Sequence, residues 1–408
     1  MGVLRYREFR LLFAGQLVSL FGDGLFAVAL SFAVLEQTGS KSGLGIVLAA
    51  GALPLVAFLL VGGVWADRLS RRRVMLAADG ARMAIQGILA ALVLSGNASL
   101  GIFIVLYGLY GVAMAFFSPA STGLIPETLP AEEFQTANGL LGMTRSVTAV
   151  AGGAAGGLLV DAVGPGSAIA LDASTFAVSA FALALMRVVA VSATTRERFA
   201  HELAVGWREV KSRRWVWMEI LVVALYLMLY VAPFEVIGPI VSRESLGGPV
   251  AWGLISASFA AGMAAGGLGM MLIRLRRPMV VALAILLTSA SPLLLAHGAP
   301  VALICGAYFV EGVAVGIWTT TWETALQREI PAQVLSRVSA WDWMGSLAGM
   351  PLGFALTGPL LALAGEQHVL YAMAAVALLL TVWMLAFADL RNIGMADAAE
   401  IISQSTHL

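Results

Sequence analysis

Three carboxylates, Asp23, Glu235 and Glu311, lie inside long apolar stretches of the sequence. Near the middle of a bilayer an ionised side chain costs about 2.5–3.5 kcal/mol even on insertion-based scales, so such a residue usually has a partner or a function. Removal from water favours the neutral form of a carboxyl group, which can release its proton on exposure to water. The chemistry that these residues predict is reversible proton binding.

The three acids differ in their expected depth. Counted at about 1.5 Å per residue, Asp23 and Glu311 lie near mid-depth, whereas Glu235 lies towards the outer end of its stretch. The segment APFEVIGPI, 232–240, could also break its helix and leave Glu235 hydrated. The alternative to proton exchange is a permanent ion pair of Arg145 with Asp23 or Glu311, or hydration in a cavity.

Three further charged residues lie closer to the ends of apolar stretches. Asp342, in SAWDWMGS, is expected at an interface or gate. Asp79 and Arg82 are one helical turn apart, and the simplest prediction is that they pair with each other.

Aromatic residues accompany the acids. Trp318 and Trp322 follow Glu311 by seven and eleven residues, roughly on one helix face. Beside a carboxylate such rings would suit a bulky amphiphile, cationic or neutral, including through cation–π contact. The alternative is a lipid-facing or interfacial position, which is commoner for a single tryptophan. The predicted lining of a substrate cavity is Asp23, Tyr107, Tyr226, Tyr230, Glu311, Trp318 and Trp322.

Apolar helices must position these residues. The 408-residue chain is 60% hydrophobic and 12% charged, whereas soluble domains carry about twice that charged fraction. Stretches of about 20 apolar residues fit a hydrocarbon core of roughly 30 Å. The pattern predicts an all-α membrane protein with twelve spanning helices near 10–35, 43–66, 74–95, 100–121, 136–159, 166–187, 217–240, 250–272, 278–297, 300–322, 335–361 and 369–388.

Basic residues are distributed unevenly between the two sides of these spans. With the N-terminus placed inside, twenty of the 24 Lys and Arg fall in cytoplasmic segments or at their helix ends, while Lys41 and Arg243 fall outside. This positive-inside bias predicts that both termini are cytoplasmic. The net charge of zero gives no indication of nucleic-acid binding.

The two halves of the chain echo each other. A charged segment at 188–216, with a predicted amphipathic helix, separates six spans from six. Gly152 and Gly157 correspond to Gly353 and Gly358 at a constant offset of 201. Two parallel six-helix repeats with a site between them are a transporter architecture. The expected units are an N-terminal bundle, 1–187, a cytoplasmic linker, 188–216, and a C-terminal bundle, 217–408.

The segment GVWADRLSRRRVM, 63–75, closes the second span with a carboxylate and a burst of arginines. At the C-terminus of a helix the dipole disfavours the Asp67 carboxylate, which needs compensation from Arg71 or from the N-terminus of a neighbouring helix. The simpler interpretation is that the arginines only set topology and bind anionic lipid headgroups.

This segment resembles the loop between helices 2 and 3 of the major facilitator superfamily, in which an aspartate packs on helix 11 and locks the cytoplasmic side. The matching residues, and thus the predicted gate motif, are Gly63, Asp67, Arg68, Arg71 and Arg72, together with Ala66. LIPETLPAEEFQTANGLLGMTRS, 124–146, and LDASTFAVSAFAL, 171–183, resemble the branch that contains macrolide exporters, the enterobactin exporter and a lysophospholipid transporter.

The resemblance covers essentially the whole chain. It implies two six-helix bundles that act as a monomer, with helices 1, 4, 7 and 10 lining a central cavity. The chain departs from the exporter motifs of the family at two positions: Tyr107 stands four residues before Gly111, where the motif has arginine, and Gly153 replaces a proline. These departures concern the proton relay of that family rather than antiport itself.

Other function classes find no support. The sequence has no Walker A pattern, so ATP is not expected to drive the protein directly. Its single cysteine, Cys305, excludes a cysteine metal cluster, and its four histidines are expected outside the spans. We therefore expect no enzyme activity, no metal and no cofactor.

The leading hypothesis is a proton-coupled exporter in a bacterial inner membrane, working by rocker-switch alternating access. Its expected partners are protons, membrane lipid and a lipophilic small molecule such as an antibiotic, drug or siderophore. The alternatives are a lysophospholipid transporter that protons do not drive, and a transport-inactive receptor or scaffold.

Overall fold

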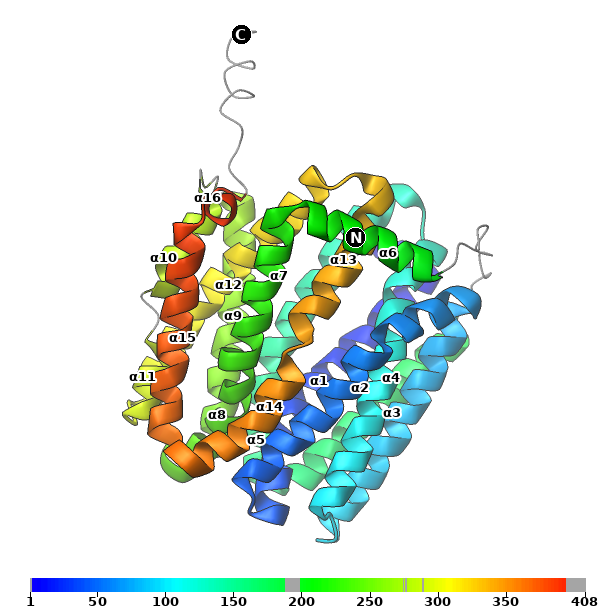
Figure 1. The fold of residues 1–408 in the computed structure, drawn as a ribbon. Coiled ribbons are helices and arrows are strands. Elements are labelled where there is room, and N and C mark those ends of the chain that lie inside the picture. Colours follow the sequence, from blue (N-terminus) through cyan, green and yellow to red (C-terminus); the bar gives the residue numbers. More distant parts are fainter. Residues whose placement is uncertain (1, 188–198, 274, 276, 288–289, 394–408) are drawn as a thin grey trace.

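The protein is described by a computed structural model that covers residues 2–187, 199–273, 275, 277–287 and 290–393, and every regular element in these ranges is a helix. Eleven helical segments of the described chain are long and apolar enough to cross a membrane. The N-terminus and α16 lie on one side of the molecule, at the top of Figure 1. We call this the terminal side and the opposite side the far side.

One of the eleven segments crosses twice. Helix α5 has 52 residues, which at 1.5 Å per residue would extend about 78 Å, more than twice the hydrocarbon core. Its helix is interrupted at Gly164, which has φ 79° and ψ 163°, a conformation that favours glycine, and Pro165 follows. The N-terminal bundle therefore has six crossings, built from η1 (Val3–Arg5), α1 (Arg7–Thr38), α2 (Lys41–Arg68), α3 (Arg71–Leu94), α4 (Leu100–Leu124), η2 (Ile125–Glu127), η3 (Ala131–Glu133) and α5 (Phe134–Leu185).

The C-terminal bundle makes six crossings with more interruptions. Its first crossing, the seventh of the chain, contains the π-helical turn η4 between α7 and α8, and two other crossings are each split into two helices. The elements are α7 (Arg214–Tyr226), η4 (Leu227–Val231), α8 (Ala232–Ser245), α9 (Pro249–Leu272), α10 (Pro278–Leu287), α11 (Ser291–Ala296), α12 (Val301–Glu329), α13 (Ala332–Leu347), α14 (Met350–Ala364), α15 (Glu366–Ala386) and α16 (Ala388–Arg391). The predicted twelve spans and two bundles are confirmed.

Glycines 201 positions apart hold equivalent places in the two bundles. Gly365, between α14 and α15, has φ 79° and ψ 162°, almost the conformation of Gly164. Gly152 of α5 packs on the backbone of α1, and Gly353 of α14 packs on Met228 of the seventh crossing. The repeat in the sequence is therefore a repeat in helix packing.

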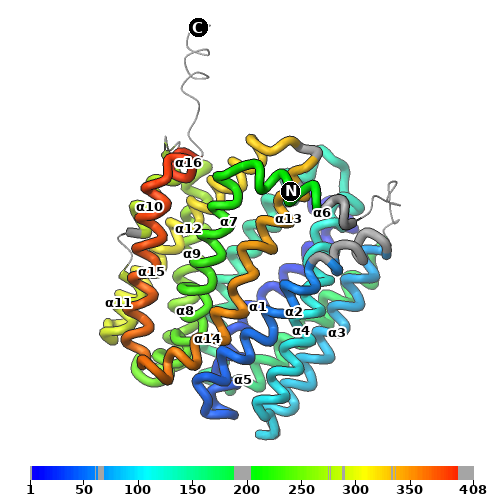
Figure 2. The backbone as a smooth tube through the Cα atoms, viewed as in Figure 1, coloured from blue at the N-terminus to red at the C-terminus, as the bar shows by residue number. Residues whose placement is uncertain are grey.

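The bundles meet through small residues in the far half of the molecule. A Cβ on Gly253 of α9 would lie 2.6 Å from the carbonyl oxygen of Gly153 in α5. Gly358 of α14 lies equally close to Ser42 at the start of α2, where a Cβ would be 2.7 Å from the Cα of Ser42. Small side chains let membrane helices approach this closely. Figure 2 shows the paths of these helices past one another.

Polar contacts between the bundles lie on the same far side. Lys41 at the start of α2 pairs with Glu244 of α8 at 2.7 Å and with Glu366 of α15 at 2.6 Å. Arg243 donates to the Leu35 carbonyl oxygen at 2.6 Å. The Lys41 side chain is 43% exposed, so each pair contributes only about 0–1 kcal/mol. The glycine contacts are thus the main closure, and the ion pairs reinforce it.

The connection between the bundles includes α6 (Phe199–Ser212), which lies across the terminal side (Figure 1). Its Trp207 ring packs at a tilt against Trp341 of α13, with centroids 4.9 Å apart, and Gly206 lies against Arg337. The linker is therefore docked on the C-terminal bundle. The rest of the expected linker, residues 188–198, lies outside the described chain.

We expect Gly253→Ala to weaken the far-side closure, because the added methyl group would overlap the Gly153 carbonyl oxygen. Overpacking of this kind costs about 1–3 kcal/mol, which would favour conformations open on the far side by about 5- to 150-fold. Double electron–electron resonance would measure the opening as a change in the distance between spin labels at positions 161 and 245. Asp161 and Ser245 are both exposed, and the labels would be introduced in a Cys305→Ser background.

Gly87→Ala is the matched control, because a Cβ at that position on α3 meets no atom within 4 Å. If both variants kept the wild-type distance distribution, the glycine contact would not control closure.

Candidate functional site

A cavity of about 230 Å³ lies between the two bundles. Its walls are apolar and aromatic, with residues of α2, α4, α8, α13 and α14, and Phe354 of α14 contacts Gly45 of α2 beneath it. These are the second, fourth, seventh and eleventh crossings. The lining therefore differs from the expected set of helices 1, 4, 7 and 10, because the far-side contact of α2 with α14 brings helices 2 and 11 to the centre.

Glu235 is the acid that faces this cavity. It lies on α8, one turn after the π-helical stretch that ends at Val231. Its side chain is exposed, and no hydrogen bond or ion pair joins its carboxylate to another described residue. The helix continues through 232–240, so the expected break there is wrong. Glu235 is thus an unpaired carboxylate in an apolar cavity.

Tyr107 and Tyr110 form the aromatic wall on α4. Both line the cavity, and their rings stack at 5.7 Å between centroids. The Tyr110 hydroxyl also donates to an oxygen of Asp23 at 2.7 Å. Asp23 itself is half-buried on α1 and is not part of the lining. A tyrosine that touches the cavity therefore connects it to an acid inside the N-terminal bundle.

Asp79 and Arg82 of α3 form the predicted ion pair, which is confirmed. Both side chains are almost fully buried, and the Ser179 hydroxyl donates to the second oxygen of Asp79 at 2.7 Å. The Arg82 guanidinium lies 4.0 Å from the centroid of the Phe117 ring and 4.3 Å from that of Phe176. A cation held by one carboxylate and two aromatic faces is stable in a low-dielectric interior.

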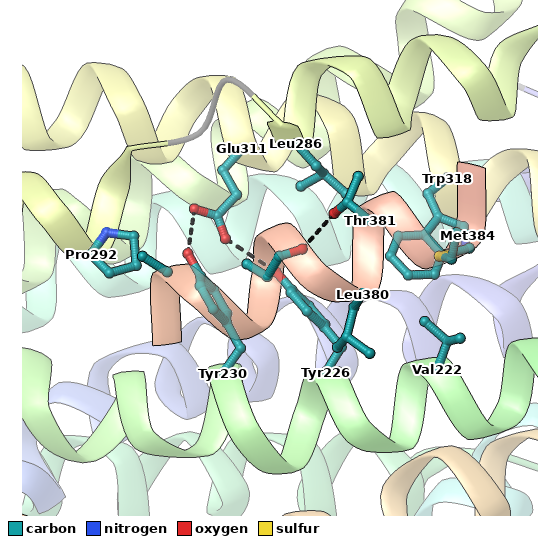
Figure 3. A pocket seen from close by; sticks show the side chains of 12 residues that line it. Val222, Tyr226, Tyr230, Leu286, Pro292, Glu311, Trp318, Leu380, Thr381 and Met384 are labelled. Carbon is teal, nitrogen blue, oxygen red and sulfur yellow. Dashed lines mark hydrogen bonds between the residues drawn. The ribbon is translucent and has the colours of Figure 1, made fainter. Parts of the chain in front are cut away.

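Glu311 lies in a second pocket, inside the C-terminal bundle (Figure 3). The hydroxyl groups of Tyr226 and Tyr230 point from the seventh crossing towards its carboxylate and donate at 3.1 and 2.8 Å. Trp318 and Thr381 also line this pocket, which has a volume of about 20 Å³. That is room for about one water molecule. The two tyrosines supply the donors that an acid at this depth requires.

The seven expected cavity residues therefore divide among four places, of which the interior of the N-terminal bundle holds Asp23. Tyr107 lies at the central cavity, and four others surround or form the Glu311 pocket. Trp322 lines neither space: its indole N–H donates to Asp342 of α13 at 3.0 Å. Asp342 is thus hydrogen-bonded within the C-terminal bundle.

Arg145 is exposed on α5, and no ion pair with Asp23 or Glu311 exists among the described residues. The alternative in which it neutralises one of these acids is therefore wrong. Arg82, not Arg145, is the cation buried near Asp23.

The expected gate motif is described in part. The side chains of Gly63, Asp67 and Arg68 lie outside the described residues, so the packing of Asp67 remains a prediction. Arg71 donates to the Gly123 carbonyl oxygen at 3.0 Å and pairs with Glu127 at 3.1 Å. Arg72 donates to two carbonyl oxygens of the last turn of α5, at 2.7 and 2.6 Å. Both arginines thus cap helix C-termini, where a cation is favourable.

Sequence reasoning missed three polar residues. Asp172 is fully buried and lies within the predicted span 166–187, so the criterion that selected Asp23 would have found it. Glu219 stands at the edge of its predicted span, yet it is 2% exposed and accepts a bond from the Trp318 indole at 3.3 Å. Tyr110 carries no local signal, because its partner Asp23 is 87 positions away.

The sequence matches the Major Facilitator Superfamily over residues 12–345. The chain belongs to this superfamily. It is similar to macrolide efflux protein A of Streptococcus pyogenes, with 24% identity over 88% of this chain and 91% of the relative. It is also similar to the multidrug efflux pump Tap of Mycobacterium tuberculosis, with 26% identity over 96% of each chain.

Solved structures show the same fold. The nucleoside transporter NupG superposes with a TM-score of 0.72 at 12% identity, over 93% of this chain and 98% of that structure. A D-xylose–proton symporter superposes with a TM-score of 0.68 at 14% identity, over 94% and 98%. At these identities the likeness concerns the major facilitator fold alone.

We expect Asp79→Asn to destabilise the protein strongly, because it leaves the buried Arg82 without its paired carboxylate. Breaking one side of a buried pair costs about 3–5 kcal/mol. Glu133→Gln is the control, since Arg5 in the Arg5–Glu133 pair is 65% exposed, and such a pair contributes about 0–1 kcal/mol. Thermal unfolding in detergent, followed by tryptophan fluorescence, compares the two. Equal changes in Tm would contradict a structural role for the buried pair.

Proposed function

We propose that this major facilitator protein exports hydrophobic or amphiphilic small molecules across a bacterial inner membrane in exchange for protons. The observation that carries the proposal is the central cavity: about 230 Å³, apolar and aromatic, with the unpaired carboxylate of Glu235 in its wall. Such a lining fits a lipophilic molecule and favours one that carries a positive charge. Its relatives named as macrolide and multidrug efflux proteins support export as the direction.

The conformation supports alternating access. The two bundles touch through Gly253, Gly358 and Lys41 on the far side, so the cavity is closed in that direction. Basic residues at the ends of helices on the terminal side support, by the positive-inside rule, a cytoplasmic position for that side. In this orientation the structure is inward-facing, ready to take substrate from the cytoplasm or the inner leaflet.

Proton exchange is assigned to the acids inside the spans. Asp23 and Glu311 accept hydrogen bonds from tyrosine hydroxyls. A tyrosine hydroxyl can donate to an ionised carboxylate and can also accept from a protonated carboxyl group, so these contacts suit both protonation states. Glu235 in the cavity wall could exchange its proton directly for a cationic substrate.

The proposal predicts that Glu235→Gln lowers export of the cation ethidium at least tenfold, while export of the neutral dye Nile red changes less than twofold. Removing the carboxylate removes its attraction for the cation in a low-dielectric cavity, and a tenfold loss corresponds to about 1.4 kcal/mol. Fluorescence of both dyes in cells without other major efflux pumps measures the rates. Glu329→Gln, an exposed acid at the end of α12, is the matched control.

The wild-type measurements separate the alternatives. Export that stops on addition of a protonophore supports antiport. Export of a labelled lysophospholipid that a protonophore leaves unchanged would instead establish the lipid transporter. If proteoliposomes exchanged none of these compounds, the result would favour a receptor or scaffold and would contradict the proposal.

A further inference from the structure

The core of the N-terminal bundle contains three acids around one cation. Asp79, Asp172 and Arg82 are 0% exposed, and Asp23 is half-buried beside them. Arg82 uses one terminal nitrogen for Asp79 and donates with the other to the Met114 sulfur at 3.2 Å. The pair of Arg82 with Asp79 is neutral. Asp23 and Asp172 therefore have no cation of their own in the described part of this core.

Asp172 has few hydrogen-bond donors. The Thr175 hydroxyl lies 3.3 Å from one carboxylate oxygen, but its single hydrogen is better placed for the Asp172 carbonyl oxygen at 2.7 Å. The other carboxylate oxygen is buried without a partner. An ionised carboxylate that lacks both a cation and donors costs several kcal/mol at such a position. A neutral carboxylic acid avoids this cost.

A second buried polar side chain without a hydrogen-bond partner, Gln86, lies at the same depth in the bundle as Asp172. Helix α3 and the second half of α5 run antiparallel: Asp79 bonds Ser179, and Arg82 packs on Phe176. One further turn in this register places Gln86 of α3 opposite Asp172. Gln86 is 1% exposed, and both its amide nitrogen and its amide oxygen lack partners. An amide is suited to this position, since it can accept from a protonated acid or donate to an ionised one.

The position of Asp172 also connects it to the cavity. A Cβ on Gly22 of α1 would overlap a carboxylate oxygen of Asp172, so the backbone of α1 lies directly against this acid. The next residue along α1 is Asp23, which accepts the hydrogen bond of Tyr110. Tyr110 in turn lines the central cavity. Movement of α4 or α1 during the cycle would therefore change the surroundings of Asp172.

We propose that Asp172 is a proton-binding site behind Asp23: it holds a proton in this conformation before substrate binds, loses it to the cytoplasm when substrate enters the cavity, and is refilled when the cavity opens to the far side. This inference rests on the proposed proton coupling. The step is a proton transfer: an O–H bond of a hydronium ion breaks as an O–H bond forms on the Asp172 carboxylate, and the reverse transfer returns the proton to water, with no change of oxidation state. The titratable or charged groups that face this site are Asp23 on α1, Asp79 and Arg82 on α3, and Tyr110 on α4.

Infrared difference spectroscopy of the purified protein in nanodiscs tests the protonation state directly. Subtracting the Asp172→Asn spectrum from the wild-type spectrum at pH 7 should leave a carboxylic acid C=O band. Asp161→Asn, an exposed acid on the same helix α5, should leave none. Because an amide resembles a neutral acid in shape and charge, Asp172→Asn should keep its Tm within about 2 °C of wild type.

A missing acid band, or a loss of Tm in Asp172→Asn as large as that in Asp79→Asn, would show that Asp172 is ionised and structural. Either result would overturn the proposal.

Transport measurements then test whether the proton is exchanged. In proteoliposomes, the ratio of ethidium uptake with and without a pH gradient should fall to about one in Asp172→Asn, while Asp161→Asn keeps the wild-type ratio. A wild-type ratio in Asp172→Asn would contradict exchange at this residue. A ratio of one in the wild type would overturn the proposed antiport, whereas the infrared band would still decide the protonation state of Asp172.

Discussion

An acid inside the hydrocarbon layer must receive hydrogen-bond donors from neighbouring helices, and this requirement organises both bundles. Tyr110 of α4 donates to Asp23 of α1, and two tyrosines of the seventh crossing donate to Glu311 of α12. Indole groups of α12 serve two further acids, Glu219 of α7 and Asp342 of α13. The donors are neutral aromatic side chains. They supply apolar surface and a polar tip together, which suits a helix buried among other helices.

These polar contacts connect helices of the same bundle, whereas the bundles meet through glycine. A hydrogen bond buried in the membrane interior is costly to break, but the close approach of Gly253 to Gly153 is held by dispersion and shape alone. The exposed ion pairs of Lys41 add little. The division gives two internally bonded bodies with a weakly bonded interface. That is the mechanical condition for rigid-body rocking.

The sequence predicted the features that depend on local properties. Apolar length identified the twelve crossings, and a spacing of three residues identified the Asp79–Arg82 pair. It did not identify Tyr110 as the partner of Asp23, because that contact joins residues 87 positions apart. Nor could it place Glu311 off the central cavity, since this depends on how α12 turns towards the seventh crossing and α15. Asp172 is a different case, because it is a carboxylate inside a predicted apolar span and the criterion that selected Asp23 would also have selected it.

The central cavity and the Glu311 pocket differ in volume, and this difference gives the acids that line them different roles. The central cavity of about 230 Å³ brings Glu235 within reach of a bulky molecule. The pocket beside Glu311, about 20 Å³, admits little more than one water molecule, so a proton can reach that carboxylate but a lipophilic substrate cannot. Asp172 is more enclosed still. Competition between substrate and proton at one carboxylate is therefore possible at Glu235 alone among these three. At the other two, coupling must pass through the tyrosines and helices that the substrate moves.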